Sequence, residues 1–271
     1  MVEDGSVEHG REGSGAPLVE LERVGKQFQD GRGHLTWVLR DFCLDVRMGE
    51  FVTIVGPSGS GKTTLLRLDA GILQPSEGAV TFAGQPVRGP GPERVMVFQS
   101  SEAALFEWLT VRQNVEFGLR AMGVGRKPRE ARATAALQLV GLGDHAGKFP
   151  HELSGGMQQR LQIARALAVE PKLLLMDEPL AALDAQTRRI LLRELVRIWQ
   201  TARTTFLYVT HDIREAVLLG QRIIVVSRAP ARVLQVLECP LPYPRDEFGQ
   251  TFVELFRKVD RAISEEVGTE L

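Results

Sequence analysis

The chain has 271 residues, of which 44% are hydrophobic and 25% are charged, a composition typical of a globular protein with a sizeable core. Its 33 basic and 34 acidic side chains leave a formal net charge of -1, so no global field attracts nucleic acid or acidic lipid, and we expect no nucleic-acid partner. The two cysteines, Cys43 and Cys239, lie far apart and match no metal-ligand spacing, which argues against disulfides and zinc and favours the cytosol.

The N-terminal segment, residues 1–17, mixes Gly, Ser, Glu and Arg and has no apolar stretch. We interpret it as a disordered leader and not as a signal peptide or a membrane helix. Elsewhere the longest apolar runs, such as Leu173 to Met176, are far shorter than the roughly 18 residues that a membrane helix needs. Any role at a membrane therefore requires a partner that spans it.

Short apolar runs alternate with helical patterns through most of the chain, at 51–55, 95–98, 173–176, 205–209 and 223–226. This rhythm predicts an α/β fold with a mainly parallel sheet. Between Leu18 and Val46, the apolar residues Phe42, Leu44 and Val46 alternate with polar ones. That alternation predicts half-exposed strands of a second, antiparallel β subdomain at the N-terminus.

Helical patterns dominate from about residue 100 to residue 168, including 130–140 and a segment that opens at Ser154. We therefore expect an α-helical subdomain inserted into an α/β domain that spans residues 18–240. From Pro240 onward, three prolines precede apolar residues at helical spacing, so residues 241–271 are predicted to form a connector and an amphipathic helix. That helix either packs on the body of the molecule or contacts a partner.

A glycine-rich loop follows the strand predicted at 51–55, and a helix opens at Lys62. In this context the pattern predicts a phosphate-binding loop, in which backbone N–H groups and the helix N-terminus surround phosphate oxygens. Lys62 would reach the β- and γ-phosphates of ATP, and the Thr63 hydroxyl would face Mg²⁺. A plain strand-to-helix turn is the alternative, but it needs no Lys-Thr pair. The expected nucleotide-binding residues are Gly56, Pro57, Ser58, Gly59, Ser60, Gly61, Lys62, Thr63 and Thr64.

Two acids, Asp177 and Glu178, follow the apolar run at 173–176. Open α/β sheets bind ligands at the carboxyl ends of their strands, so Asp177 is the expected Mg²⁺ partner, usually through water. Glu178 is the candidate general base for the hydrolytic water. A solvated Asp-Glu pair before the turn at Pro179 is the alternative.

The segment Leu153-Ser154-Gly155-Gly156-Met157-Gln158-Gln159-Arg160 resembles the signature of ATP-binding cassette (ABC) transporter ATPases, whose fold is a P-loop NTPase core. The resemblance runs from about Leu18 to Ser227. It implies a head-to-tail homodimer, in which Ser154, Gly155 and Gly156 of one copy close over ATP held by the other.

The same resemblance assigns roles to single residues, which keep the family's order along this chain. It implies that His211 contacts the γ-phosphate and that Gln99 senses Mg²⁺ and the water. Asp184 would link the two sites of the dimer. Phe28 would stack on adenine, with Trp37 as a rival.

Three finer features resemble the nitrate, sulfonate and taurine importer branch: the segments 106–111 and 210–216, and Tyr243-Pro244-Arg245 before the terminal helix. That resemblance implies ATP hydrolysis coupled to transmembrane transport. The dimer would lie on the cytoplasmic face of the inner membrane, clamped to integral-membrane permease subunits and served indirectly by an extracytoplasmic substrate-binding protein. A groove near Gln99 and Trp108 would receive a permease helix. A lipid-trafficking ATPase and a soluble, non-transport ABC ATPase are the alternative functions.

Some residues depart from the family pattern, above all Asp69, where relatives usually carry an aliphatic residue. Asp69 lies four residues after Leu65 and so on the same face of the helix, where an unpaired carboxylate would cost several kcal/mol or bind a proton. Glu107 replaces a common proline, and Gly220-Gln221 replaces a usual Ala-Asp pair. These departures concern permease docking and the substrate branch rather than ATP chemistry.

Overall fold

In the computed structural model, residues 16–98, 104–202 and 204–268 are described. Of the predicted leader, only Ala16 and Pro17 belong to this part, and Gln99 lies outside it. None of the helices within these ranges combines the length and the apolar character that a bilayer crossing requires.

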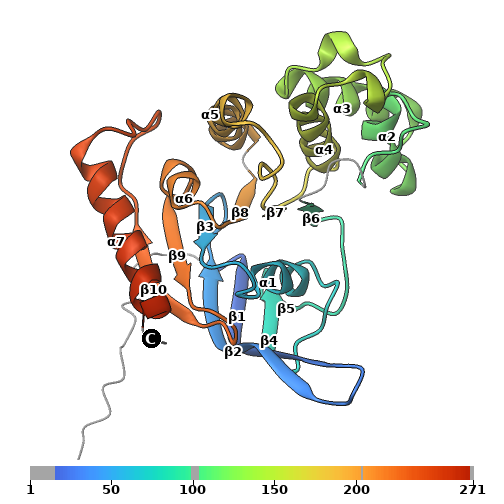
Figure 1. Cartoon of the computed structure of the whole chain (residues 1–271). Helices are drawn as coiled ribbons and strands as arrows, with labels where there is room; N and C mark the ends of the chain where they lie inside the picture. Colours follow the sequence, from blue (N-terminus) through green and yellow to red (C-terminus); the bar gives the residue numbers. More distant parts are fainter. Residues whose placement is uncertain (1–15, 99–103, 203, 269–271) are drawn as a thin grey trace, which may run out of the picture.

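A six-stranded sheet in the order β10-β9-β3-β8-β7-β6 forms the centre of the molecule (Figure 1). Five neighbouring strands run parallel, and only the edge strand β10 is antiparallel to its neighbour. This confirms the mainly parallel sheet. The strand bounds are β3 Phe51–Val55, β6 Arg94–Val97, β7 Leu173–Asp177, β8 Thr205–Thr210, β9 Arg222–Val226 and β10 Val233–Glu238.

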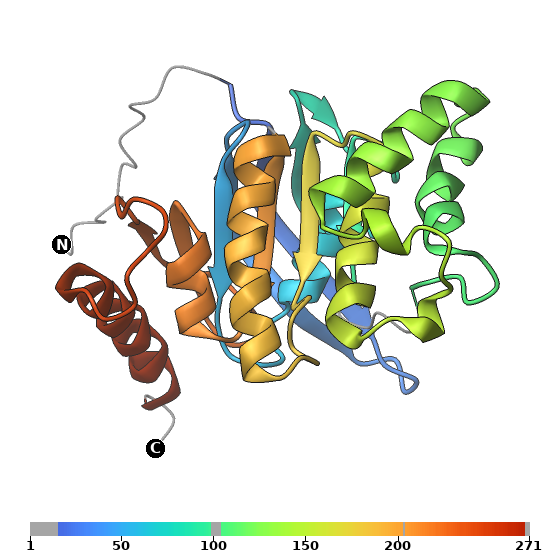
Figure 2. The same cartoon turned by 90° about the horizontal axis from the view of Figure 1, so that it is seen from above.

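Both faces of this sheet are covered, which is why its central strands are buried at every residue. Alternate residues of β3, such as Phe51 on one face and Ile54 on the other, belong to different core clusters. On the first face lie the helices α5 (Ala185–Ala202) and α6 (Ile213–Leu219), as Figures 1 and 2 show. On the second face lies α1 (Lys62–Asp69) together with the smaller sheet.

The smaller sheet has the order β2-β1-β4-β5, with bounds Leu35–Val46, Val19–Gln29, Glu77–Phe82 and Gln85–Pro86, and all its pairs are antiparallel. Phe42, Leu44 and Val46 are buried and the residues between them are exposed, as the alternating pattern predicts. The sequence did not indicate β4, β5 or β10. β5 and β10 are short strands at sheet edges, and their mostly exposed or half-buried residues have no clear apolar pattern.

Three helices, α2 (Val111–Ala121), α3 (Arg126–Leu139) and α4 (Gly155–Ala168), pack on one another in a separate lobe beside β6 (Figure 2). Short 3-10 turns at Gly143–His145 and Pro150–Glu152 connect them. Thr110 and Gln113 close a capping box that starts α2. This lobe is the inserted α-helical subdomain.

The C-terminal helix α7 (Gln250–Gly268) packs on the body of the molecule. Phe252, Leu255 and Val259 are buried in a third core cluster with residues of β3, α6 and β9. In the connector before α7, the Arg245 guanidinium donates to the carbonyl oxygens of Val217 and Gly220 at 2.6 and 2.7 Å, and the Tyr243 hydroxyl donates to the Leu219 carbonyl. The connector thereby caps the end of α6.

The unusual Gly220-Gln221 pair has a local explanation. A Cβ atom at position 220 would collide with the Thr53 hydroxyl, which is itself buried and donates to the Ala216 carbonyl at 3.2 Å. The Gln221 side-chain oxygen accepts a hydrogen bond from the Phe51 N–H at 3.2 Å. Thr53 therefore requires glycine at 220, and Gln221 holds the start of β3.

Candidate functional site

The glycine-rich loop connects β3 to α1 in the conformation that its glycines permit. Gly59 and Gly61 have φ angles of +77° and +91°, in the left-handed region that favours glycine. A Cβ atom at Gly61 would lie 2.7 Å from a methyl group of Val38, so β2 packs directly against the loop. The smaller sheet therefore supports the loop from one side.

Lys62 points back over the loop that precedes it. Its ammonium group donates to the carbonyl oxygens of Gly56 at 2.8 Å and Pro57 at 2.7 Å, and to the Ser60 hydroxyl at 3.3 Å. Burial lowers the pKa of Lys62, while the nearby carboxylates of Glu178 and Asp177 act in the opposite direction. The loop thus holds a largely desolvated cation, suited to an anionic ligand. Ser58 and Gly59 are exposed on the same loop, and Thr64 is half-buried on α1.

The expected Mg²⁺ partners lie together. The Thr63 hydroxyl donates to Asp177 Oδ1 at 3.0 Å, although the two residues come from α1 and from the end of β7. Burial raises the pKa of Asp177, and the charge of Glu178 adds to this effect. A hydroxyl and a partly buried carboxylate are hard oxygen donors, which fit Mg²⁺. Within the described ranges, no group of three or more His, Cys, Asp or Glu residues could hold a metal.

Glu178 and His211 form a close pair. The imidazole Nδ1 lies 2.8 Å from Glu178 Oε2, and since an ionised carboxylate only accepts hydrogen bonds, Nδ1 is the donor when Glu178 is ionised. Glu178 has a φ angle of +43°, rare for a residue with a side chain, and its N–H donates to the Val209 carbonyl at 3.0 Å. The end of β7 is thereby tied to the end of β8.

Sheet order explains why these residues meet. The glycine-rich loop follows β3, the two acids lie at the end of β7, and His211 follows β8, which runs between the other two. Since the strands are parallel, their carboxyl ends share one edge of the sheet. The structure therefore brings together Lys62, Thr63, Asp177, Glu178 and His211.

The signature segment lies at a different place. Ser154 caps α4, its hydroxyl accepting a hydrogen bond from the Met157 N–H at 3.4 Å, and both Ser154 and Gly155 are exposed. A Cβ atom at Gly156 would lie 2.6 Å from a Thr187 methyl group, so α4 and α5 pack closely here. Among the described residues, no hydrogen bond or ion pair joins this segment to the glycine-rich loop of the same chain.

Asp184 begins α5. Its Oδ1 accepts hydrogen bonds from the N–H groups of Gln186 and Thr187, each at 3.0 Å. The hydrogen bonds from Thr187 lower the pKa of Asp184, which keeps this exposed carboxylate ionised. Within one chain, Asp184 is therefore a helix cap.

Both candidate adenine-stacking residues lie in the β1–β2 hairpin. The Phe28 side chain is 41% exposed, and the Lys26 ammonium lies 5.3 Å from its ring centroid. Trp37 is half-buried against Gly25 and directly precedes Val38, which contacts the loop. The exposure of its ring favours Phe28 as the adenine-stacking residue, whereas proximity to the glycine-rich loop favours Trp37, so the stacking residue stays a prediction. The role of Gln99, which lies outside the described residues, also stays a prediction.

Sequence reasoning missed a buried network behind His211. The Glu215 carboxylate, only 5% exposed, accepts hydrogen bonds from the hydroxyls of Tyr208 at 2.9 Å and Thr210 at 2.8 Å. Burial raises the pKa of Glu215, and those two hydroxyl donors oppose the rise. Arg188 lies 3.8 Å from the same carboxylate. Two features of the sequence could have pointed to this network: Glu215 lies inside the 210–216 segment, and Arg188 lies one helical turn after Asp184.

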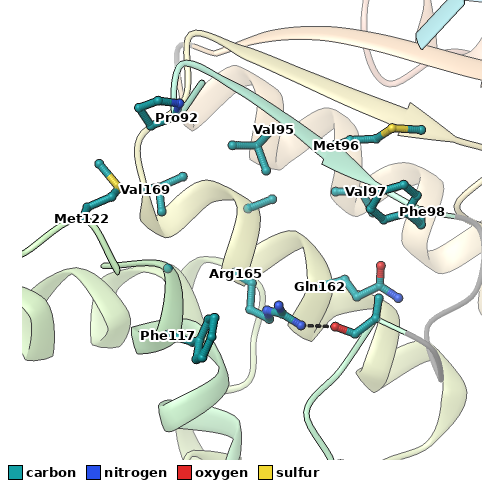
Figure 3. Close-up of a pocket in the computed structure, with 13 residues that line it drawn as sticks. Pro92, Val95, Met96, Val97, Phe98, Phe117, Met122, Gln162, Arg165 and Val169 are labelled. Atoms are coloured by element: carbon teal, nitrogen blue, oxygen red, sulfur yellow. Dashed lines mark hydrogen bonds between the residues drawn. The ribbon is translucent and has the colours of Figure 1, made fainter. Parts of the chain in front are cut away.

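A groove of about 600 Å³ runs between β6 and the helical lobe (Figure 3). Its walls are mostly apolar, and Arg165 donates to the Ala104 carbonyl at one end. Trp108, 73% exposed, packs beside Phe106, which in turn contacts the groove residue Phe117. The lining includes Val95, Phe98, Phe117, Met122, Gln162 and Val169. This is the region in which we expected a permease helix.

Comparisons with known proteins agree on one family. A family model described as "ABC transporter" matches residues 39–181. The chain is 52% identical over 204 residues to a putative ATP-binding protein of Brucella abortus, covering 75% of this chain and 78% of the relative. It is 46% identical over 224 residues to a nitrate import ATP-binding protein of Synechocystis sp., covering 83% of each. A taurine import ATP-binding protein of Jannaschia sp. is 43% identical over 220 residues, or 81% of each.

Solved structures give the same result. A dimeric ATP-binding cassette in a post-hydrolysis state, bound to ADP and Pi, is 32% identical with a TM-score of 0.69, covering 82% of this chain and 99% of that chain. The cbiO1 protein of Clostridium perfringens, part of an ABC transporter complex, is 28% identical with a TM-score of 0.75, covering 94% of this chain and 99% of that chain.

Proposed function

This chain belongs to the ABC transporter family, and on that premise we propose that it is the ATP-hydrolysing subunit of an importer for a small anion or organic solute. The observation that carries the proposal is the cluster of Lys62, Thr63, Asp177, Glu178 and His211 at one edge of the sheet. The importer assignment is supported by relatives named for nitrate, taurine and bicarbonate transport.

ATP is the substrate in this proposal. The loop N–H groups and the N-terminus of α1 hold its phosphates, and the Lys62 ammonium exchanges its loop acceptors for phosphate oxygens. Thr63 and Asp177 would hold Mg²⁺, which when bound neutralises charge on the β- and γ-phosphates. Glu178 accepts a proton from the water that attacks the γ-phosphorus, and ADP leaves. His211 orients the Glu178 carboxylate through its Nδ1–H contact.

A second copy completes the site. The exposed N-terminus of α4 is a helix end with outward N–H groups, which favours an anion. One glycine-rich loop already holds the phosphates, so we assign the Ser154, Gly155 and Gly156 segment to nucleotide on the partner's loop, with Asp184 near the interface. Shifting a two-state equilibrium from 1:99 to 99:1 takes about 5.5 kcal/mol, and charged hydrogen bonds contribute about 1.5 to 3 kcal/mol each. A few hydrogen bonds between the signature segment and the phosphates, made only in the closed dimer, are therefore enough to shift the equilibrium from the open to the closed state.

The composite site makes a testable prediction. In a Glu178→Gln background that prevents turnover, ATP is expected to convert the chain into a dimer, measured by light scattering. Adding Ser154→Arg should weaken dimerisation at least ~10-fold while ATP affinity stays the same, because Ser154 contacts nucleotide only across the interface. Adding Lys62→Ala to the Glu178→Gln background should abolish both ATP binding and ATP-dependent dimerisation.

The matched control is Ser264→Arg, which places the same bulk and charge on an exposed position of α7. It should leave dimerisation intact. An ATP-dependent dimer that persists with Ser154→Arg would show that the signature segment does not close over nucleotide.

The membrane partner is a permease, and the groove beside β6 is the proposed docking site. We predict that the chain co-purifies with its co-expressed permease from membranes, on the cytoplasmic side. Trp108→Glu should reduce this association strongly, because it places a charge on the exposed aromatic surface at the groove. Phe248→Glu, at an 87% exposed phenylalanine in the C-terminal connector, should not. Equal losses in both variants would argue against the groove, and stable binding to ribosomes or DNA would argue against transport.

A further inference from the structure

We propose that Arg188 and Glu215 act together as a positioning pair that fixes the loop between Glu178 and Asp184 relative to His211. This loop, residues 178–184, is called the acid loop below. The inference rests on the proposed function, since it concerns the residues to which ATP hydrolysis and dimer contact are assigned. It adds two residues that touch none of the reacting atoms.

Arg188 holds the acid loop through its backbone. The guanidinium donates from Nε to the Leu180 carbonyl at 3.2 Å, and from Nη2 to the carbonyls of Ala181 and Leu183 at 3.3 and 2.9 Å. Three acceptors on one planar group fix the path of the chain, which a flexible ammonium group cannot do. The loop between its two functional ends is thus shaped by one side chain from the first turn of α5.

Glu215 holds the other side. Its Oε2 accepts hydrogen bonds from Thr210 and Tyr208, and its Oε1 faces Arg188 at 3.8 Å. Thr210 directly precedes His211, and its hydroxyl oxygen also accepts a hydrogen bond from the Asp212 N–H at 3.0 Å. Glu215 thus holds Thr210, which precedes His211, and the Thr210 hydroxyl holds Asp212, which follows it. The backbone on both sides of His211 is therefore fixed.

The two halves meet between α5 and α6, which contact each other above the sheet (Figure 1). Arg188 comes from α5, and Glu215 comes from α6. A shift of the acid loop would move the guanidinium, and the buried carboxylate would carry that shift to the segment around His211. Glu178 and His211 are also in direct contact at 2.8 Å. Arg188 and Glu215 therefore hold in place the two chain segments that make this contact.

The test separates positioning from general stability. Arg188→Ala is expected to lower kcat by at least ~10-fold, because small displacements of a catalytic group cost that much or more. Its Kd for a fluorescent ATP analogue should stay within about twofold, since Arg188 contacts no phosphate-binding residue. Arg188→Lys should restore the melting temperature but not kcat. Arg193→Ala, the same change at an exposed position of α5, should keep wild-type kcat.

A double-variant cycle tests the pairing. Glu215→Gln keeps an oxygen acceptor for Tyr208 and Thr210 but removes the charge that faces Arg188. If the two residues act as one unit, Arg188→Ala with Glu215→Gln loses no more kcat than Arg188→Ala alone, whereas independent residues would multiply their losses.

Three results would overturn the pair. These are wild-type kcat in Arg188→Ala, full recovery of kcat in Arg188→Lys, or multiplied losses in the double variant. The Glu178→Gln variant distinguishes this from failure of the proposed function. If Glu178→Gln is inactive while Arg188→Ala turns over normally, only the positioning pair is wrong; if Glu178→Gln turns over normally, the base assignment is wrong.

Discussion

Replacing Glu178 with glutamine is expected to lower the rate of ATP hydrolysis by at least ~10²-fold while ATP binding is preserved, because a positioned general base contributes about 10² to 10⁴ in rate. Glutamine has the shape of glutamate and its side-chain oxygen still accepts the His211 Nδ1–H contact. It cannot take a proton from water at neutral pH. Phosphate release at saturating ATP gives the rate, and a fluorescent ATP analogue gives the affinity.

A matched control exists in the same chain. Glu170 also has a positive φ angle, +57°, and forms an exposed ion pair with Arg132 at 3.2 Å. Glu170→Gln therefore repeats both the backbone conformation and the chemical change outside the site, and it should hydrolyse ATP normally. Turnover of Glu178→Gln within a few-fold of the wild type would assign the base to another group.

The second large effect concerns stability. Asp69 is 1% exposed, and neither of its carboxylate oxygens has a hydrogen-bond partner among the described residues. This confirms the expected burial on the apolar face of α1. Burial raises the pKa of Asp69 to about 8, with the Arg94 charge acting in the opposite direction. At neutral pH the folded chain therefore holds a proton on this carboxyl group.

The sign of the pH effect follows from the two states. The unfolded carboxyl group releases its proton near pH ~3.9, whereas the folded one keeps it up to about pH 8. Between these values the unfolded state binds fewer protons, so the contribution of Asp69 to the free energy of unfolding falls as pH rises. The contribution changes little below pH ~3.9, and it changes little more above pH 8.

Asp69→Ile is expected to raise the melting temperature by several degrees at pH 7, because it removes a buried group that lacks a partner, which costs on the order of several kcal/mol. The advantage over the wild type should grow from pH 5 to pH 8. Thermal unfolding across that range measures both effects. Asp69→Asn, close to aspartate in volume, should remove the pH dependence but keep part of the penalty, because its amide is still buried.

Isoleucine is larger than aspartate, and overpacking can cost about 1 to 3 kcal/mol, so Asp69→Val is a useful second variant. If all three variants melt at or below the wild-type temperature with the same pH dependence, the carboxyl group is not buried without a partner in solution.

Local patterns predicted the chemistry at the sheet edge well. Continuous apolar runs predicted β3, β7 and β8. Because these strands are parallel, the residues that follow them lie at the same edge of the sheet. The helix expected at 130–140 begins earlier, at Arg126, and an exposed ion pair between Arg126 and Glu130 at 2.8 Å joins its first two turns. The spacing of apolar residues does not show this boundary, because the first turn of α3 consists of basic residues and a proline.

The positioning pair could not be predicted in the same way. Arg188 binds backbone carbonyl groups, and Glu215 binds two hydroxyls and a charge from another helix. Every residue has a backbone carbonyl group, so the sequence does not show which of them accept hydrogen bonds from Arg188. The contact between α5 and α6 depends on tertiary packing. The adenine contact is similar, because a hairpin offers both Phe28 and Trp37 and only packing against a nucleotide distinguishes them.

The docking of α7 also has a consequence for biosynthesis. Val55, at the end of the strand that enters the glycine-rich loop, shares its core cluster with Phe252, Leu255 and Val259. Because β3 precedes α7 by about 200 residues, the nascent chain carries an uncovered apolar surface beside its future nucleotide loop until α7 has been made. The connector that caps α6 arrives equally late. The strand that enters the glycine-rich loop therefore acquires its full apolar packing only after α7 has been made.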